Sequence, residues 1–189
     1  MLVTSMITRQ EALQLLDEHV TNAKKKRHSL AIAAIMKGLA KKLSMDEEEW
    51  ELVGLLHDLD YDAIGGDMCR HGLVAAEMLE GKLPEEGLHA IRAHDYRTAV
   101  KPESKLDRAL IAADCVWILI VRVAFVASNG RINRIKHFAL RNAFKSKSFP
   151  AFLKSGILMC GNFGLSLEEF LDTALNALPS DLVVNKEDL

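Results

Sequence analysis

The stretch LVGLLHDLDYD, residues 52–62, is the part of this chain that decides its fold. Apolar residues run up to the dipeptide His57-Asp58, where a helix that opens at about Ser44 is expected to end. An aspartate at the C-terminal end of a helix is unfavourable, because its charge opposes the helix dipole. A bound cation would remove this conflict. The stretch therefore predicts a helix whose C-terminal end faces a cation.

Helical signals dominate the rest of the chain as well. Four pairs in which Ser or Thr precedes an acidic residue by three positions mark helix starts: Thr8–Glu11, Ser44–Glu47, Ser104–Asp107 and Ser166–Glu169. Helical segments are further expected at about 22–43, 68–79, 85–94, 131–145, 149–160 and 167–177. No stretch alternates polar and apolar residues over the length of a strand. We predict an all-α fold, a compact helical bundle, with residues after about 180 frayed.

Composition narrows the class of protein. The 189 residues are 49% hydrophobic, which suits a single domain over residues 1–189 with a substantial core. The formal net charge of −2 argues against a nucleic-acid partner. Three widely spaced cysteines favour a reducing compartment, and the N-terminus lacks the pattern of a signal peptide. We therefore predict a cytoplasmic protein.

The most apolar stretch runs from Ala109 to Ala127 and is interrupted by Asp114 and Arg122. We expect it to be a buried helix rather than a membrane span, so no membrane partner is predicted. Its apolar residues after Asp114 are also a candidate homodimer interface: Trp117, Ile118, Ile120 and Val121.

Asp114 is the hardest residue to explain as packing, because it is embedded in ALIAADCVWILIV, residues 109–121. A buried carboxylate without a partner costs several kcal/mol or shifts its pKa, so it needs a cationic partner or a metal. Three further histidines lie near expected helix ends: His28, His71 and His94. Each of them alone is more often a packed or surface residue. Together with Asp114 they point to one site.

The set of four imidazoles and two carboxylates suits one or two divalent transition metals. Mn, Fe, Co, Ni or Zn accept this mixture, whereas all-oxygen sites suit Mg or Ca better. Asp58 has two oxygens and is the natural bridge between two metals. Two metals about 3.5–4 Å apart can share a hydroxide and hold a phosphoryl group between them.

These residues resemble the signature of the HD-domain metal-dependent phosphohydrolases, which consists of an upstream His, a His-Asp pair and a downstream Asp. His28, His57-Asp58 and Asp114 match it. The segment LLHDLDYD is similar to the helix-ending segment of the HDIG subtype, although Leu59-Asp60 follows the pair here. CRHGLVAAEML and LPEEGLHAIRAHD resemble the extra histidine segments of the subgroup that carries six ligands and two metals.

The resemblance implies a metal-binding core at about residues 22–120, and the helices at about 131–180 would then be a C-terminal elaboration. It implies that His28, His57, Asp58 and Asp114 hold one metal. It implies that Asp58, His71 and His94 hold the second. The implied reaction is hydrolysis of a phosphomonoester or phosphodiester, with a nucleotide as the favoured small substrate, by attack of a metal-activated hydroxide.

Other polar residues near the core have weaker assignments. Besides Asp58, Asp60 is a candidate catalytic residue, in its case for proton transfer. Asp60 and Asp62 could instead orient ligands or waters, or be ordinary loop acids. Arg97 is the best single candidate for a contact with the substrate phosphate. The interval between Asp114 and Glu168 holds eight basic residues and no acidic one. It is either a solvated face or a rim that attracts a phosphorylated substrate.

Two alternatives remain open. Some relatives of this fold use two irons to activate oxygen and cleave a carbon bond, and the ligand set is compatible with a di-iron oxygenase. The domain could also be a non-catalytic module that binds a metal or a nucleotide. A structural role rarely needs two carboxylates and four imidazoles, which makes the non-catalytic alternative less favoured.

Overall fold

Polar caps decide where most of the helices begin. In the computed structural model, which describes residues 6–188, Thr8 and Glu11 form a reciprocal capping box at the start of the first helix. Ser104 with Asp107 and Ser166 with Glu169 do the same further along the chain. The α-helices of the described residues are α1 (Arg9–His19), α2 (Ala23–Leu43), α3 (Glu47–Leu56), α4 (Leu73–Met78), α5 (Glu85–Ala93), α6 (Lys105–Ala127), α7 (His137–Lys145), α8 (Ala151–Leu158) and α9 (Leu167–Ala177).

Short 3-10 helices complete the secondary structure: Tyr96–Thr98, Ile132–Arg134, Met159–Phe163 and Lys186–Asp188. Within residues 6–188 there is no β-strand, and the one extended pairing is an isolated bridge between Arg131 and Val183. The prediction of an all-α bundle is therefore confirmed.

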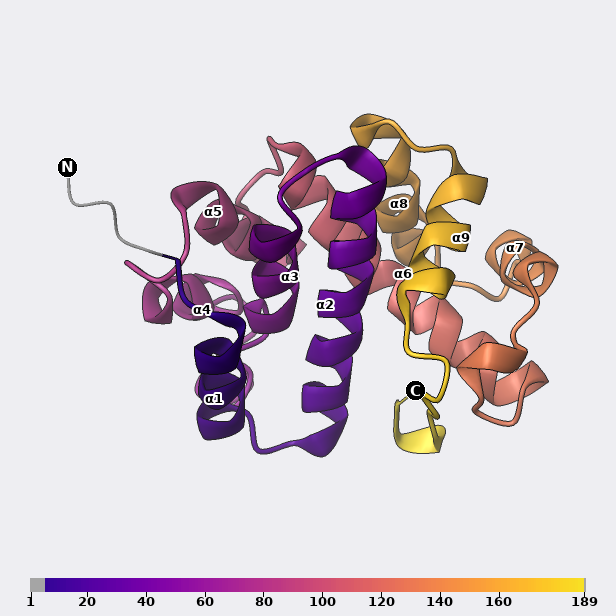
Figure 1. Cartoon of the computed structure of the whole chain (residues 1–189), viewed down its shortest axis with the longest axis horizontal. Coiled ribbons are helices and arrows are strands. Elements are labelled where there is room, and N and C mark those ends of the chain that lie inside the picture. Colours follow the sequence, from indigo (N-terminus) through magenta and orange to yellow (C-terminus); the bar gives the residue numbers. More distant parts are fainter. Residues whose placement is uncertain (1–5, 189) are drawn as a thin grey trace.

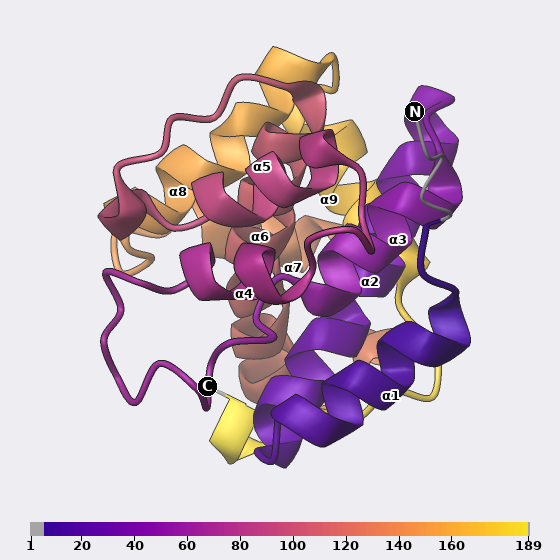
Figure 2. The ribbon, with the colours of Figure 1, turned by 90° about the vertical axis from the view of Figure 1, so that its left-hand side faces the viewer.

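Helix α2 is central to the arrangement (Figure 1). α3 packs on one side of α2 and α9 packs on the other side, and α6 passes behind them. α5 and α8 both pack on α6, while α4 packs on α5 (Figure 2). One hydrophobic cluster runs through all of these helices. As a result, the ends of α3 and α5 come close to the middle of α6.

Two predicted helix starts differ from the structure. Ser44 does not cap α3, because it adopts a left-handed conformation (φ 56°) that ends α2. Asp46 caps α3 instead, and its Oδ1 accepts hydrogen bonds from the backbone N–H groups of Glu48 and Glu49, each at 3.0 Å. The helix expected from Met68 begins only after Gly72, whose φ of +80° is incompatible with a helix.

The prediction of a frayed C-terminal segment is wrong. The backbone N–H of Val184 donates to the carbonyl of Gly130 at 2.8 Å, and the side chain of Val184 is buried. Further on, Asp188 accepts a hydrogen bond from Arg27 of α2 at 2.9 Å. The tail therefore lies against the fold and reaches α2.

Helix α6 is long and apolar enough to cross a membrane by length and composition alone. In the fold, 61% of its most apolar window is buried, and helices α2, α5, α7, α8 and α9 all pack on it. These are also the properties of the core helix of a globular domain. The expectation of a buried helix is thus confirmed.

Burial of α6 corrects the predicted dimer interface. Trp117, Ile120 and Val121 are at most 3% exposed, so they belong to the core of this chain and are not available to a partner. Ile118 is 39% exposed and lines a cavity described below. A homodimer remains a prediction, but Trp117, Ile120 and Val121 are not part of its interface.

Asp107 offers a test of how α6 is held at its start. Its carboxylate accepts hydrogen bonds from the backbone N–H groups of Glu103 and Ser104, at 2.7 and 3.0 Å, and lies 2.9 Å from the ring nitrogen of His89. Burial alone would raise the pKa of Asp107, but these N–H donors lower it below its ordinary value. The stabilisation is therefore present above the unfolded pKa and is lost as the pH falls through the folded pKa.

We expect Asp107→Asn to lower the free energy of unfolding by about 1–2 kcal/mol at neutral pH. The difference from the wild type should shrink below the pKa of a free aspartate, about 3.9. Urea titrations at neutral pH and at a pH below this pKa measure the difference in the free energy of unfolding. The exposed Asp181→Asn is the control. A difference that is independent of pH would contradict the role of the ionised carboxylate.

Candidate metal centre

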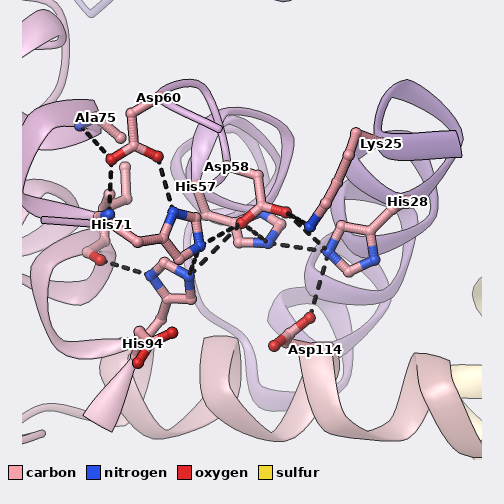
Figure 3. Close-up of polar contacts among 12 residues, drawn as sticks. Lys25, His28, His57, Asp58, Asp60, His71, Ala75, His94 and Asp114 are labelled. Carbon is pink, nitrogen blue, oxygen red and sulfur yellow. Dashed lines mark hydrogen bonds and ion pairs between the residues drawn. The ribbon is translucent and has the colours of Figure 1, made fainter. Parts of the chain in front are cut away.

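Six side chains from five segments meet where α2, α3, α5 and α6 come together (Figure 3). His28 lies on α2, and Asp114 lies in the middle of α6. His57 and His94 directly follow α3 and α5, in the C-cap position. The other two lie in turns: Asp58 directly follows His57, and His71 precedes α4. The structure thus brings together all six residues that the resemblance implies as ligands.

The two C-cap histidines are held in the same way. Nδ1 of His57 donates to the carbonyl of Gly54 at 2.8 Å, and Nδ1 of His94 donates to the carbonyl of Ile91 at 2.7 Å. A carbonyl can only accept, so the proton of each neutral ring is on Nδ1 and Nε2 carries a lone pair. Ending a helix at a histidine therefore aims a lone pair out of the helix and into the site.

The first group consists of His28, His57 and Asp114, whose potential ligand atoms all lie within 4.8 Å of one another. Nε2 of His28 is 3.1 Å from Nε2 of His57 and 3.2 Å from Oδ1 of Asp114. It is also 3.5 Å from Oδ2 of Asp58. Lone pairs and carboxylate oxygens thus converge on one point, which is favourable only when a proton or a cation lies among them.

The second group consists of His57, Asp58 and His94, with His71 beside it. Oδ1 of Asp58 is 2.9 Å from Nε2 of His71 and 3.7 Å from Nε2 of His94. The Nε2 atoms of His71 and His94 are 3.2 Å apart. Oδ1 of Asp58 faces this group while Oδ2 faces His28, which is the geometry of a carboxylate that can serve two cations.

Burial sets the charges of this cluster. Desolvation lowers the pKa of the fully buried His57 to about 4, so its ring is neutral at physiological pH. Burial would raise the pKa of Asp58, but the surrounding imidazoles, that of His57 first, hold it well below its ordinary value. Asp58 is therefore a carboxylate anion enclosed by imidazoles.

Asp114 is less enclosed than the sequence suggests. Its side chain is 32% exposed, because α6 presents it to a cavity rather than to the core. Burial raises the pKa of Asp114, yet the hydrogen bond with His28 outweighs this and lowers it to about 2. The apolar sequence around Asp114 faces the core, while Asp114 itself faces the site.

Asp60 does not face the cavity and is not placed to transfer a proton to a substrate. Its Oδ1 lies 2.9 Å from Nδ1 of His71, and its Oδ2 accepts from the backbone N–H groups of Gly72 and Ala75 at 2.7 and 3.0 Å (Figure 3). Asp60 therefore fixes the ring of His71 and the start of α4, a role that supports metal-binding histidines.

His71 itself is charged in the absence of a metal. Burial lowers its pKa, but the hydrogen bonds to Asp58 and Asp60 raise it to about 9. A metal that takes Nε2 of His71 as a ligand must displace this proton.

Gly72 allows the turn with His71 to approach α5. Its φ is +80°, and a Cβ there would lie 2.5 Å from the carbonyl oxygen of Ile91 and 3.1 Å from the ring of His94. Any other residue would push this turn away from α5. The sequence analysis did not single out Gly72, although its place directly after a candidate ligand is a usable signal.

Lys25 is a site residue that the sequence analysis missed. Its Nζ lies 2.9 Å from Oδ2 of Asp58 and 3.9 Å from the centre of the Tyr61 ring. Two of the neighbouring basic side chains turn elsewhere, since Lys26 pairs with Asp17 and Arg27 with Asp188, whereas Lys24 also lines the cavity described below. The signal was available, because Lys25 and His28 are three residues apart and therefore share a helix face.

A cavity of about 770 Å³ opens over the cluster and is lined by His28, Asp58, His71, His94 and Asp114. Arg97 also lines it, but both Nε and an Nη atom of its guanidinium already bond the carboxylate of Asp95. None of the basic residues from Arg122 to Lys154 lines this cavity, so the structure favours a solvated face for that interval.

Asp62 lies outside the site, and so do two histidines that the sequence analysis did not single out, His89 and His137. Asp62 accepts hydrogen bonds from the backbone and the hydroxyl of Thr21, both at 2.7 Å, and so ties two loops together. His89 contacts Asp107, and His137 contacts Asp172 at 2.6 Å. These residues are structural.

The donor set fits divalent transition metals. Imidazoles and carboxylates are ligands that such metals accept, and the carbonyl and carboxylate partners on Nδ1 of His57, His71 and His94 are those found behind metal-binding histidines. Two groups of these residues could each hold an ion: His28, His57 and Asp114, and His57, Asp58 and His94.

Comparison with known proteins points the same way. Residues 26–116, a range that contains all six residues, match the model of the HD domain family. Over 95 residues, 48% of this chain, the sequence is 33% identical to Ribonuclease Y of Lawsonia intracellularis (strain PHE/MN1-00). The similar region is only 17% of that protein. No solved structure matches the chain.

Asp60 and Asp62 form a matched pair for testing the support of His71. We expect Asp60→Asn to weaken metal binding about 10- to 100-fold, because His71 loses the carboxylate that orients it. Asp62→Asn should leave metal affinity unchanged, since its partner is Thr21 in a distant loop. Calorimetric titration with Mn²⁺ measures the affinities, and circular dichroism checks that each variant folds. Equal affinities in folded Asp60→Asn and wild-type protein would rule out this role.

Proposed function

We propose that this protein is a metal-dependent phosphoric ester hydrolase of the HD-domain type. The observation that carries the proposal is the convergence of fixed imidazole lone pairs and the two carboxylates of Asp58 and Asp114 at the floor of a cavity. Divalent metals bound there would polarise phosphoryl oxygens and lower the pKa of a bound water. We further propose that the core at about 22–120 and the helices at about 131–180 act as one domain.

The protein's own residues would supply position and charge. Asp58 directs one oxygen toward each half of the cluster, and Asp60 keeps the ring of His71 in place. Lys25 lies beside Asp58 at the cavity wall, where an ammonium group can contact an anionic phosphate. In the hydrolysis the P–O bond to the alcohol breaks, water supplies the new P–O bond, and the alcohol takes up a proton.

The cavity supports a small substrate. A volume of about 770 Å³ lies in the usual range for sites that enclose one small molecule. A nucleotide is the small substrate that the sequence favours, and Arg97, which lines the cavity, is the candidate contact to its phosphate. The three cysteines are unpaired, in keeping with a reaction in the cytoplasm.

Metal content and turnover test the proposal together. We expect purified protein to bind at least one divalent metal per chain and to hydrolyse phosphate esters when loaded with Mn, Fe, Co, Ni or Zn. Asp58→Asn and Asp114→Asn should each lower kcat/KM about 100-fold or more, because loss of a mere supporting partner already costs 10- to 100-fold. The exposed Asp181→Asn is the control.

Less than one metal per chain, with no rescue by any of the five metals, would contradict the proposal. Oxygen uptake by the iron-loaded protein with a polyol or phosphonate, together with no hydrolysis in Mn²⁺, would favour the di-iron oxygenase instead.

Lys25 and Lys26 are adjacent in sequence, and substituting each of them tests whether Lys25 binds the phosphate. We expect Lys25→Met to lower kcat/KM about tenfold, since a hydrogen bond to a charged group contributes about 1.5–3 kcal/mol. Lys26→Met should have no effect, because Lys26 pairs with Asp17 at the surface. Metal content at saturation, measured by elemental analysis, should be the same in both variants. Unchanged kinetics in Lys25→Met would show that this lysine does not contact substrate.

A further inference from the structure

The wall of the cavity next to the metal cluster is apolar. On α6, Ile111 and Ile118 lie three residues before and four residues after Asp114, so all three share one helix face. All three line the cavity. A ligand that reaches the cluster at Asp114 therefore meets hydrocarbon on both sides of it along α6.

Helix α8 supplies the next part of this wall. Gly156 lets α8 lie directly on α6, because a Cβ at Gly156 would be 2.4 Å from Sγ of Cys115. This close packing brings Phe152 and Leu153 to the cavity, and Met159 follows at the end of α8. α8 lies outside residues 26–116, so the wall is a feature of this chain beyond the HD match.

Apart from the candidate ligands, the charged side chains that line the cavity are those of Lys24, Lys25, Asp95, Arg97, Lys101 and Asp188. Nζ of Lys25 lies 2.9 Å from Oδ2 of Asp58, and Asp95 and Arg97 pair with each other. Val100 and Pro102, on either side of Lys101, add further apolar side chains. The cavity thus offers a cation beside the cluster that suits a phosphate and an apolar wall on α6 and α8 that suits a hydrocarbon group.

We propose that the substrate is a small phosphate ester whose organic group is apolar, an aryl or alkyl group, and that α6 and α8 hold this group. The proposal rests on the hydrolase function above and names its substrate class. The nucleotide that the sequence favours is the competing class, because its ribose hydroxyls and base nitrogens would meet the side chains of Ile118, Leu153 and Phe152, which form no hydrogen bonds.

Binding of non-hydrolysable probes separates the two ends of the cavity. The probes are inorganic phosphate, 1-naphthylphosphonate and the phosphonate analogue of adenosine monophosphate, titrated calorimetrically into Mn²⁺-loaded protein. We expect 1-naphthylphosphonate to bind at least about tenfold more tightly than either of the others, because the apolar surface of its rings would be buried against the wall.

Two pairs of variants test whether the apolar wall formed by α6 and α8 causes the preference for 1-naphthylphosphonate. Phe152→Ala and Ile118→Ala should each weaken 1-naphthylphosphonate binding about tenfold and leave inorganic phosphate unchanged. Their controls are Phe138→Ala and Phe125→Ala, which remove side chains of similar exposure, 63% against 67% and 42% against 39%. Neither control residue lines the cavity.

Tighter binding of the adenosine analogue, or equal effects in variants and controls, would overturn the substrate class and leave the hydrolase proposal standing. Failure of inorganic phosphate to bind the loaded protein would contradict both.

Discussion

The buried carboxylate of Asp58 is the constraint on which the rest of this structure depends. It is an anion with a side chain only 4% exposed, at the point where α2, α3 and α5 meet α6. Such a charge is costly in the interior unless cations or donors surround it. Three imidazoles and the Lys25 ammonium lie within 3.5 Å of it, and His94 lies slightly further away. The stability of the fold therefore depends on α2, α3 and α5 bringing these groups to Asp58.

Helix ends do the positioning in this site. α3 and α5 each end at a histidine whose Nδ1 bonds the carbonyl three residues earlier, so the backbone itself selects the tautomer. His71 does not follow a helix, so no helix carbonyl bonds its ring. The carboxylate of Asp60 bonds its Nδ1 instead. The outcome is the same for all three rings, namely that Nε2 is directed at Asp58 or its neighbours. Rigid orientation of this kind is what a metal site requires of its surroundings.

Much of the fold follows from local patterns, because caps act over three or four residues. Thr8, Ser104 and Ser166 begin helices as their spacing to an acidic residue predicts. Ser44 fails because Asp46 is a competing cap two residues later, and propensity alone does not decide between them. The tail after residue 180 also escaped prediction, since its order comes from Gly130 and Arg27, which are distant in sequence.

The sequence by itself determined which residue types could form the centre and that they lie on helices or close to helix ends, because helix signals and the His-Asp pair are local. Only the tertiary structure decided which lysine faces Asp58, that Asp60 supports His71 rather than the cavity, and that α8 closes the site with apolar side chains. Each of these depends on how helices far apart in the chain pack together. Side-chain direction across such contacts is set by packing of the whole core, which no short window of sequence contains.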